Sequence, residues 1–278
     1  MKILVTGGYG QLGRALQKCL SDCEKIIAVD SDTCDVTDAA QIKSCVQKYL
    51  PDIIIHCAAY TAVDRAESET ELCRRINVSG TRILADLCCA CDIPLMLMST
   101  DYVFGDNGDM PHSTDDVRNA LNQYGQSKID AEDIVMTLEK HYIVRTSWLF
   151  GDGKNFVKTI YGLSQKKAVI DVVADQIGSP TFAEDIAFAI HDLIRKAPYG
   201  VYHLTNEGYC SWADLAEKVI VLTGSDARIN RVKTSEYISA ARRPLNSRLS
   251  KSLLDKYSIA RLPDWEDALQ RYISLWEL

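Results

Sequence analysis

Short apolar runs alternate with longer amphipathic stretches through the first 150 residues of the chain. The runs are rich in β-branched residues and lack polar alternation, which is typical of strands that are covered on both faces. They fall at residues 2–6, 25–30, 52–58, 95–100 and 142–147. The helical patterns between them supply that cover. We therefore predict an α/β fold with a Rossmann-type doubly wound parallel sheet, whose ligand site lies beyond the carboxyl ends of the strands.

The second half of the chain mixes single strands with helices and predicts a smaller α/β lobe. We expect a dinucleotide-binding domain over residues 1–150, to which about 177–205 return. A discontinuous substrate-binding lobe is expected over 151–176 and 206–278. The sequence shows no internal repeats, low-complexity runs or long linkers, so function should come from individual positions on the fold.

Charge and composition exclude several classes of protein. The 278 residues carry 31 Lys and Arg against 38 Asp and Glu, a net charge of −7, which argues against a broad nucleic-acid-binding surface. Only a few apolar residues precede the first glycines, so the N-terminus is neither a signal peptide nor a membrane span. We expect a cytoplasmic protein with neither nucleic acid nor membrane as a partner.

The chain contains ten cysteines. Because the cytoplasm is reducing, we expect most of them to be small buried hydrophobic residues rather than disulfide partners. Cys88, Cys89 and Cys91 cluster in an expected helix, and no histidine follows at ligand spacing. Structural packing is the favoured interpretation and metal or redox use is the alternative. No metal site is predicted.

A glycine-rich loop follows the first strand directly. Gly7, Gly10 and Gly13 are spaced three apart, and a helical pattern begins immediately afterwards. The first glycine permits a sharp turn, the second lets the backbone approach a pyrophosphate, and the third lets the helix pack close to the strand. Because the loop lies between a strand and a helix at the start of an alternating pattern, it predicts dinucleotide binding.

Asp30 ends the second strand, where a carboxylate accepts hydrogen bonds from the adenosine ribose. The segment SDTCDVTD that follows contains no Lys or Arg to receive a 2′-phosphate, so NADH is predicted to be preferred over NADPH. Asp35 and Val36 are placed to flank the adenine, although Asp35 or Thr37 could equally cap the next helix.

The end of the third strand carries small residues and a hydroxyl, in the order Ala58, Ala59, Tyr60 and Thr61. They either let the backbone lie against the cofactor or simply pack the end of the strand. His56, within the strand, is interpreted as a hydrogen-bonded core residue rather than a ligand.

Two segments carry the candidate chemistry. Tyr124 and Lys128 are four residues apart, so on a helix they share one face. An ammonium group near a phenol stabilises the phenolate and lowers the pKa of the tyrosine, which can then pass a proton at neutral pH. Thr100, at the end of the fourth long strand, can hydrogen-bond the same reacting oxygen. We predict that these three residues are catalytic.

The sequence resembles the extended short-chain dehydrogenase/reductases and, within them, the dTDP-4-dehydrorhamnose reductase family. The resemblance runs nearly end to end, through GGYGQLG, AAYTAVDRAESE, STDYVFGD, NQYGQSK, VRTSWLFG, NF, DQIGSPT, YHLTNEG and RRPLNSRL. It implies that NADH or NADPH reduces the C4 keto group of dTDP-4-dehydro-β-L-rhamnose to give dTDP-β-L-rhamnose, the last step of dTDP-L-rhamnose biosynthesis.

The resemblance also implies residue roles. Tyr124 matches the proton donor, Lys128 the residue that orients the nicotinamide ribose and tunes the tyrosine, and Thr100 a residue that assists at the sugar oxygen. Positions matching the sugar-nucleotide pocket are Thr61, Val63, Asp101, Tyr102 and Trp148. Positions matching the dinucleotide site are Gly10, Gln11, Leu12, Asp30, Asp35, Val36, Ala59, Tyr60 and Met98.

The matching sequence segments in the second half of the chain each allow two interpretations from the residues alone. Trp148 either contacts the sugar or plugs the interface between the lobes, and Asn155 either contacts substrate or begins a helix. Arg243 and Asn246 lie in RRPLNSR, a rare basic cluster that suits a diphosphate but could also be a capped loop.

The sequence departs from the resembled family at one place. Some family members form Mg-bridged dimers through a glutamate just inside the first helix, where this chain has Ala15, although a carboxylate near Glu184 remains. We therefore expect a monomer or a dimer formed without metal. Two other functions stay open: a reductase or epimerase of another nucleotide-linked sugar, and a non-catalytic subunit resembling the regulatory β subunit of methionine adenosyltransferase.

Overall fold

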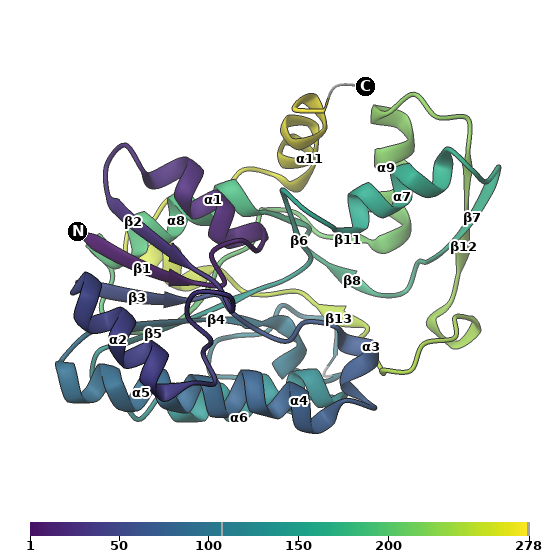
Figure 1. Ribbon diagram of the computed structural model, residues 1–278. Helices are drawn as coiled ribbons and strands as arrows, with labels where there is room; N and C mark the ends of the chain where they lie inside the picture. The colour runs from purple at the N-terminus through teal and green to yellow at the C-terminus, as the bar shows by residue number, and fades with distance from the viewer. Residues whose placement is uncertain (107, 277–278) are drawn as a thin grey trace.

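A six-stranded, fully parallel sheet forms the centre of the computed structural model, which describes residues 1–106 and 108–276 (Figure 1). Its strands are β1 (Lys2–Thr6), β2 (Lys25–Val29), β3 (Ile53–His56), β4 (Leu95–Thr100), β5 (His141–Thr146) and β10 (Gly200–His203). Their order is β10-β5-β4-β3-β1-β2, so the direction of winding reverses between β1 and β3. The five predicted strands and the doubly wound parallel sheet are confirmed.

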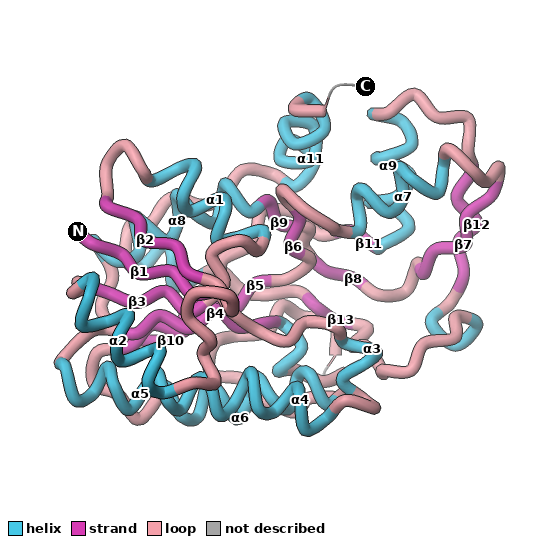
Figure 2. Tube along the Cα trace, viewed as in Figure 1, coloured by secondary structure: helices cyan, strands magenta, loops and turns pink. Residues whose placement is uncertain are grey.

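Helices cover both faces of this sheet, as the uninterrupted apolar strands require. One face is covered by α1 (Gln11–Leu20) and α8 (Ala183–Lys196), which pack against each other. The other is covered by α2 (Ala39–Tyr49), α5 (Gly80–Cys91) and α6 (Gln123–Val135) (Figures 1 and 2). Between β3 and α5 lie α3 (Val63–Ala66), α4 (Thr70–Arg74) and the π-helical turn Arg75–Ser79, and a 3₁₀ turn, Asp101–Val103, follows β4.

A smaller lobe stands beside the carboxyl ends of the strands and has its own apolar core, which includes Phe150, Val157, Val219 and Leu269. Its helices are α7 (Phe156–Ser164), α9 (Trp212–Leu222) and α11 (Trp265–Ser274). Its short strands are β6 (Leu149–Phe150), β7 (Val169–Val173), β8 (Ile177–Gly178), β9 (Thr181–Phe182), β11 (Cys210–Ser211), β12 (Arg228–Val232) and β13 (Asn246–Ser247), and a 3₁₀ turn lies at Thr234–Glu236. They form the sets β12-β7, β6-β9 and β11-β8-β13.

The chain returns from the smaller lobe to the sheet more than once. Helix α8 covers the sheet, and β10 pairs with β5 in parallel register. Later in the chain, α10 (Ser252–Lys256) contacts β10. Leu254, Ile259 and Leu262 are buried in the same core as the α1 and α8 side of the sheet. The sheet side of the molecule therefore also contains residues from the last quarter of the chain.

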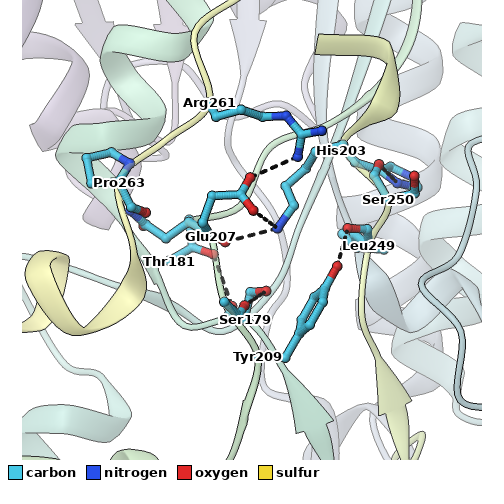
Figure 3. A network of polar contacts seen from close by, with 12 residues as sticks. Ser179, Thr181, His203, Glu207, Tyr209, Leu249, Ser250, Arg261 and Pro263 are labelled. Atoms are coloured by element: carbon cyan, nitrogen blue, oxygen red, sulfur yellow. Dashed lines mark hydrogen bonds and ion pairs between the residues drawn. The ribbon is translucent and has the colours of Figure 1, made fainter. Parts of the chain in front are cut away.

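Three crossings between the sheet side and the smaller lobe meet in one polar network (Figure 3). Glu207, on the way from β10 to β11, accepts a hydrogen bond from Arg261 at 2.9 Å. Its second carboxylate oxygen lies 3.5 Å from the Nζ of Lys251, whose side chain is almost completely buried. The backbone N–H of Glu207 donates to the carbonyl of Pro263 at 2.9 Å. Residues 203–209, 249–251 and 261–264 are thus bonded together where they cross.

Within residues 1–106 and 108–276, no helix is both long and apolar enough to cross a membrane. All ten cysteines are free thiols. His56 is buried between the hydroxyls of Thr6, at 2.7 Å, and Thr81, at 3.2 Å. The prediction of a hydrogen-bonded core histidine is confirmed.

Candidate active site

A cavity of about 580 Å³ opens at the carboxyl ends of the parallel strands, next to the reversal between β1 and β3. This is the place where a doubly wound sheet binds its ligand. Its lining includes the glycine loop at one side, the catalytic candidates of β4 and α6, and the beginning of the smaller lobe. The predicted residues in this lining are Gly7, Gly10, Gln11, Leu12, Gly13, Asp30, Asp35, Val36, Ala59, Thr61, Met98, Thr100, Asp101, Tyr124, Lys128 and Trp148.

The glycine loop forms a backbone cradle that larger residues would fill. Gly7 has a φ of +67°, and a Cβ there would lie 2.6 Å from the backbone N of Ala58. A Cβ on Gly13 would lie 2.4 Å from the carbonyl oxygen of Gly7. Gly10 caps α1 without a side-chain hydrogen bond, so its side chain satisfies none of the free N–H groups of the helix's first turn. This cradle suits the pyrophosphate of a dinucleotide.

Gln11, in the same loop, supplies a second sign of a ligand site. Its Oε1 atom is buried and has no hydrogen-bond partner among the described residues. A buried acceptor left unpaired is costly, which a bound molecule carrying a donor would relieve.

The wall after β2 is formed by Asp30, Ser31, Cys34, Asp35 and Val36. The carboxylate of Asp30 accepts hydrogen bonds from the backbone N–H groups of Tyr9, at 3.0 Å, and Ser31, at 2.8 Å, which fix its position at the cavity edge. Neither of the alternative capping residues caps α2. That role belongs to Asp38, whose side chain accepts from two N–H groups of the first turn, while Asp35 accepts from Thr37.

Tyr60 was predicted to contact the dinucleotide, but its side chain lies outside the cavity lining. Its hydroxyl donates to Glu69, and its backbone N–H donates to the buried side chain of Asn77 at 2.7 Å. The neighbours Ala59 and Thr61 do line the cavity.

The catalytic candidates come together from two elements. Thr100 ends β4, and Tyr124 and Lys128 lie one turn apart on α6, which begins where Asn122 caps the N–H of Gly125 at 2.8 Å. All three side chains line the same cavity. A hydrogen bond with Thr100 lowers the pKa of Tyr124, but burial outweighs it and raises that pKa above its ordinary value.

Burial also affects the charge of Lys128. Burial lowers the pKa of its ammonium to about 8, against the opposing effect of Glu132. Burial is also the largest effect on the Tyr124 phenol, so the pKa of the tyrosine is raised in this structure.

Asp101 and Tyr102 follow Thr100 directly. Asp101 is almost fully buried and lines the cavity, and its Oδ2 has no hydrogen-bond partner among the described residues. Burial raises its pKa to about 7. The ring of Tyr102 lies edge-on to that of Tyr124, with centroids 6.1 Å apart. Tyr102 itself lies outside the cavity lining.

Trp148 enters the cavity from the start of the smaller lobe and is held in an unusual backbone conformation, with φ at +49°. Its carbonyl accepts a hydrogen bond from the N–H of Thr181 at 3.1 Å. Its indole stacks on Trp212, so it both lines the cavity and packs between the lobes.

Besides Tyr102, four residues predicted to meet the substrate lie outside the cavity lining: Val63, Asn155, Arg243 and Asn246. Asn155 caps α7 and donates to Tyr272 Oη at 2.9 Å, as its helix-start alternative implied. Asn246 is buried and donates to the carbonyl of Met110 at 2.8 Å. Arg243 forms an ion pair with Asp64 at 2.7 Å, which fastens the basic loop to α3. Val63 begins α3.

Several cavity residues were absent from the sequence prediction. They are Ser31, Cys34, Cys57, Ile76, Ser99, Thr146, Ser147 and Leu149. Most of them directly adjoin a predicted residue at the end of a strand, so their position in the sequence could have identified them. Nothing in the sequence around Ile76, on the π-helical turn, indicates that it lines the cavity. Cys34 and Cys57 show that two of the cysteines border the site as well as packing the core.

The place of the metal-bridging carboxylate is closed in this chain. Ala15 is buried in the core shared by α1 and α8, and Glu184 forms an ion pair with Lys18 at 2.6 Å. Among the described residues, no group of three or more His, Cys, Asp or Glu side chains is placed to hold a metal ion.

A doubly wound sheet, a glycine cradle and a Thr-Tyr-Lys cluster beyond the strand ends define a dinucleotide-binding protein of the extended short-chain dehydrogenase/reductase class. The family model described as "RmlD substrate binding domain" matches residues 1–277, and the chain belongs to that family.

Relatives agree along the whole chain. A dTDP-4-dehydrorhamnose reductase of Aggregatibacter actinomycetemcomitans is 35% identical, covering 97% of each chain. The crystal structure of a dTDP-4-dehydrorhamnose reductase from Clostridium acetobutylicum superimposes with a TM-score of 0.97 at 37% identity, over 100% of both chains. That of Bacillus anthracis, in complex with NADP, gives a TM-score of 0.95 at 39% identity over 98% of both.

Proposed function

We propose that this protein is an NAD(P)H-dependent reductase that converts dTDP-4-dehydro-β-L-rhamnose to dTDP-β-L-rhamnose. The observation that carries the proposal is the meeting of Thr100, Tyr124 and Lys128 in one cavity with the glycine cradle. Full-length similarity to proteins named dTDP-4-dehydrorhamnose reductase supports the choice of substrate. The complete catalytic set disfavours a purely regulatory subunit, which has no chemical need for it.

The glycine cradle, Gln11 and the wall after β2 are the groups that would hold a nicotinamide dinucleotide. When bound, that cofactor supplies the hydride. Tyr124 gives a proton to the oxygen that becomes the C4 hydroxyl, and Thr100 hydrogen-bonds the same region. Lys128, charged below a pH of about 8, would donate to the nicotinamide ribose of the bound cofactor and would favour the phenolate that remains after transfer.

The preference for NADH over NADPH forms a finer part of this proposal. Asp30 places a carboxylate at the end of β2, and Tyr9 and Ser31 hold it there through their N–H groups. A 2′-phosphate beside it would meet a like charge. The Bacillus anthracis relative was crystallised with NADP, so kcat/KM measured with both cofactors decides the point. Comparable values would contradict the preference.

We propose that residues 1–150, with about 177–205, bind the dinucleotide, and that 151–176 and 206–278 hold the sugar nucleotide. The protein should act as a monomer or as a dimer formed without metal. Burial of Ala15 and the Lys18 to Glu184 ion pair support this, since neither offers a free carboxylate beside α1.

The proposal is tested by following NADH and NADPH oxidation at 340 nm with dTDP-4-dehydro-6-deoxy sugar and its epimerase, with and without EDTA. We expect oxidation that depends on the sugar nucleotide and is insensitive to EDTA. Absence of turnover with both cofactors would remove the proposed activity. A dimer that dissociates in EDTA would contradict only the metal-independent assembly.

A further inference from the structure

Trp212 stands behind the cavity rather than in its lining. It is the first residue of α9, where Ser211 and Asp214 form a reciprocal capping box that fixes the start of the helix. Its indole stacks on that of Trp148 with ring centroids 3.7 Å apart and planes 12° apart. The ring of Phe156 on α7 also packs against the Trp212 indole, with ring centroids 4.5 Å apart and planes tilted by 52°. Trp212 is therefore anchored by two helices of the smaller lobe.

Gly178 restricts Trp148 from a second direction. A Cβ at this glycine would lie 2.7 Å from Cε2 and 2.9 Å from Cζ2 of the Trp148 indole. Such distances are too short for any larger residue, so the backbone of β8 touches the ring directly. Trp148 thus packs against the Gly178 backbone and the Trp212 ring, and the part of it that remains accessible faces the cavity.

The backbone of Trp148 is itself in a costly conformation. A non-glycine residue with positive φ is uncommon, and surrounding contacts must hold it there. The hydrogen bond from Thr181 supplies one such contact, and the stacked indole of Trp212 supplies another. Without the second ring, the Trp148 side chain would be free to leave the orientation in which it lines the cavity.

We propose that Trp212 is a positioning residue for substrate recognition: it holds the Trp148 indole in place against the sugar of the bound sugar nucleotide. The inference rests on the proposed function and on the contact between Trp148 and the sugar that the family resemblance implies. Trp212 acts only through Trp148. It should affect affinity for the sugar portion of the ligand and leave the nucleotide and cofactor contacts unchanged.

The test compares Trp212→Leu, Trp212→Phe and wild-type protein in calorimetric titrations with dTDP-L-rhamnose, dTDP and NADH. Wild type is expected to bind dTDP-L-rhamnose more tightly than dTDP. Trp212→Leu should lose this sugar increment, the extra affinity for dTDP-L-rhamnose over dTDP. Its Kd for dTDP-L-rhamnose should therefore rise roughly tenfold, the order expected for one aromatic contact. Its Kd for dTDP and for NADH should stay within about twofold. Trp212→Phe should keep most of the increment because it still stacks.

Steady-state kinetics distinguish a positioning role of Trp212 from a merely structural one, because only a positioning role raises KM selectively. With the keto sugar nucleotide, Trp212→Leu should raise KM by roughly tenfold while changing kcat less, and Trp212→Phe should restore KM. The matched control is Trp265→Phe, in the core of the same lobe beside Gly208, which should leave the sugar increment unchanged.

Two results overturn the inference, and they are distinguishable. If wild type discriminates dTDP-L-rhamnose from dTDP and Trp212→Leu does so equally well, only the role of Trp212 is wrong. If wild type itself binds both ligands equally, Trp148 does not meet a sugar and the proposed substrate falls with the inference. Should the leucine variant unfold, the phenylalanine variant decides: retention of most of the increment supports the inference, and complete loss of the increment with unchanged dTDP and NADH binding overturns it.

Discussion

The phenol of Tyr124 keeps its proton throughout the neutral range, since burial raises its pKa and the hydroxyl of Thr100 offsets that rise only in part. A protonated phenol is the state that an acid catalyst needs. We expect Tyr124→Phe to lower kcat at least about 100-fold, the usual contribution of a general acid. NADH affinity should be nearly unchanged, because the glycine cradle is untouched.

Oxidation at 340 nm and an NADH titration measure the two quantities. Tyr161→Phe, which removes a phenol hydroxyl on α7, is the control and should retain wild-type turnover. A Tyr124→Phe variant that keeps more than about a tenth of kcat would leave less than ~1.4 kcal/mol of the barrier to this residue, and its role would be wrong.

Asp101 makes the folded state sensitive to pH. Its pKa is about 7 in the folded protein, whereas an aspartate in an unfolded chain titrates near 3.9. Between these values the unfolded chain has released a proton that the folded chain retains, so rising pH favours unfolding. Asp101→Asn removes this loss. We expect it to be more stable than wild type by on the order of 2–4 kcal/mol at pH 8, and by much less at pH 5.

Urea unfolding of both proteins at the two pH values measures this difference. Asp109→Asn, an exposed carboxyl of the following loop, is the control and should change stability little at either pH. An Asp101→Asn stabilisation of equal size at pH 5 and pH 8 would show that the carboxyl does not titrate as inferred.

At the scale of elements, two helical glycines should respond oppositely to the same change. A Cβ on Gly13 of α1 would lie 2.4 Å from the carbonyl oxygen of Gly7, while nothing lies within 4 Å of a Cβ on Gly162 of α7. Gly13→Ala should destabilise the protein by about 1–3 kcal/mol through overpacking and should weaken NADH binding. Gly162→Ala should stabilise it by about 0.5–1 kcal/mol through helix propensity. Thermal unfolding and NADH titration compare the two variants. If both changed the stability of the protein in the same direction, the packing explanation would be wrong.

The elements that could be predicted were those whose identity follows from local pattern. All six residues of β4 are buried, so an uninterrupted apolar run was a true sign of a covered strand. The glycine loop and the Tyr124 to Lys128 spacing likewise depend on neighbours in sequence. What could not be predicted was side-chain direction: Asn155 and Asn246 have suitable chemistry but donate to distant carbonyls and hydroxyls instead. The stack of Trp212 on Trp148 joins segments that only the tertiary fold brings together.

At the scale of the whole molecule, the crossing network of Figure 3 contains a buried cation. Lys251 is almost fully buried beside Glu207, which is only partly buried. Glu207→Gln should destabilise the protein by about 1–2 kcal/mol, less than for a fully buried pair because water reaches the carboxylate. The double variant Glu207→Gln with Lys251→Met should recover most of this loss, since no unpaired charge remains.

Urea unfolding of the single and double variants measures the coupling. Glu266→Gln removes the exposed partner of Lys218 and is the control, with an expected effect below about 0.5 kcal/mol. Failure of the double variant to recover stability would mean that Glu207 acts through its bonds to Arg261 rather than through the buried ammonium.

The core of the smaller lobe joins residues that are synthesised far apart in time. Phe150 and Phe182 pack against Tyr272 of α11, which is translated after both of them. The strands β1 to β5 precede all of this lobe in the chain, and so do the glycine cradle that follows β1 and Thr100 at the end of β4. During translation the dinucleotide half of the cavity can therefore assemble first, while the wall that carries Trp148 acquires its packing only after Trp212 of α9 has been translated.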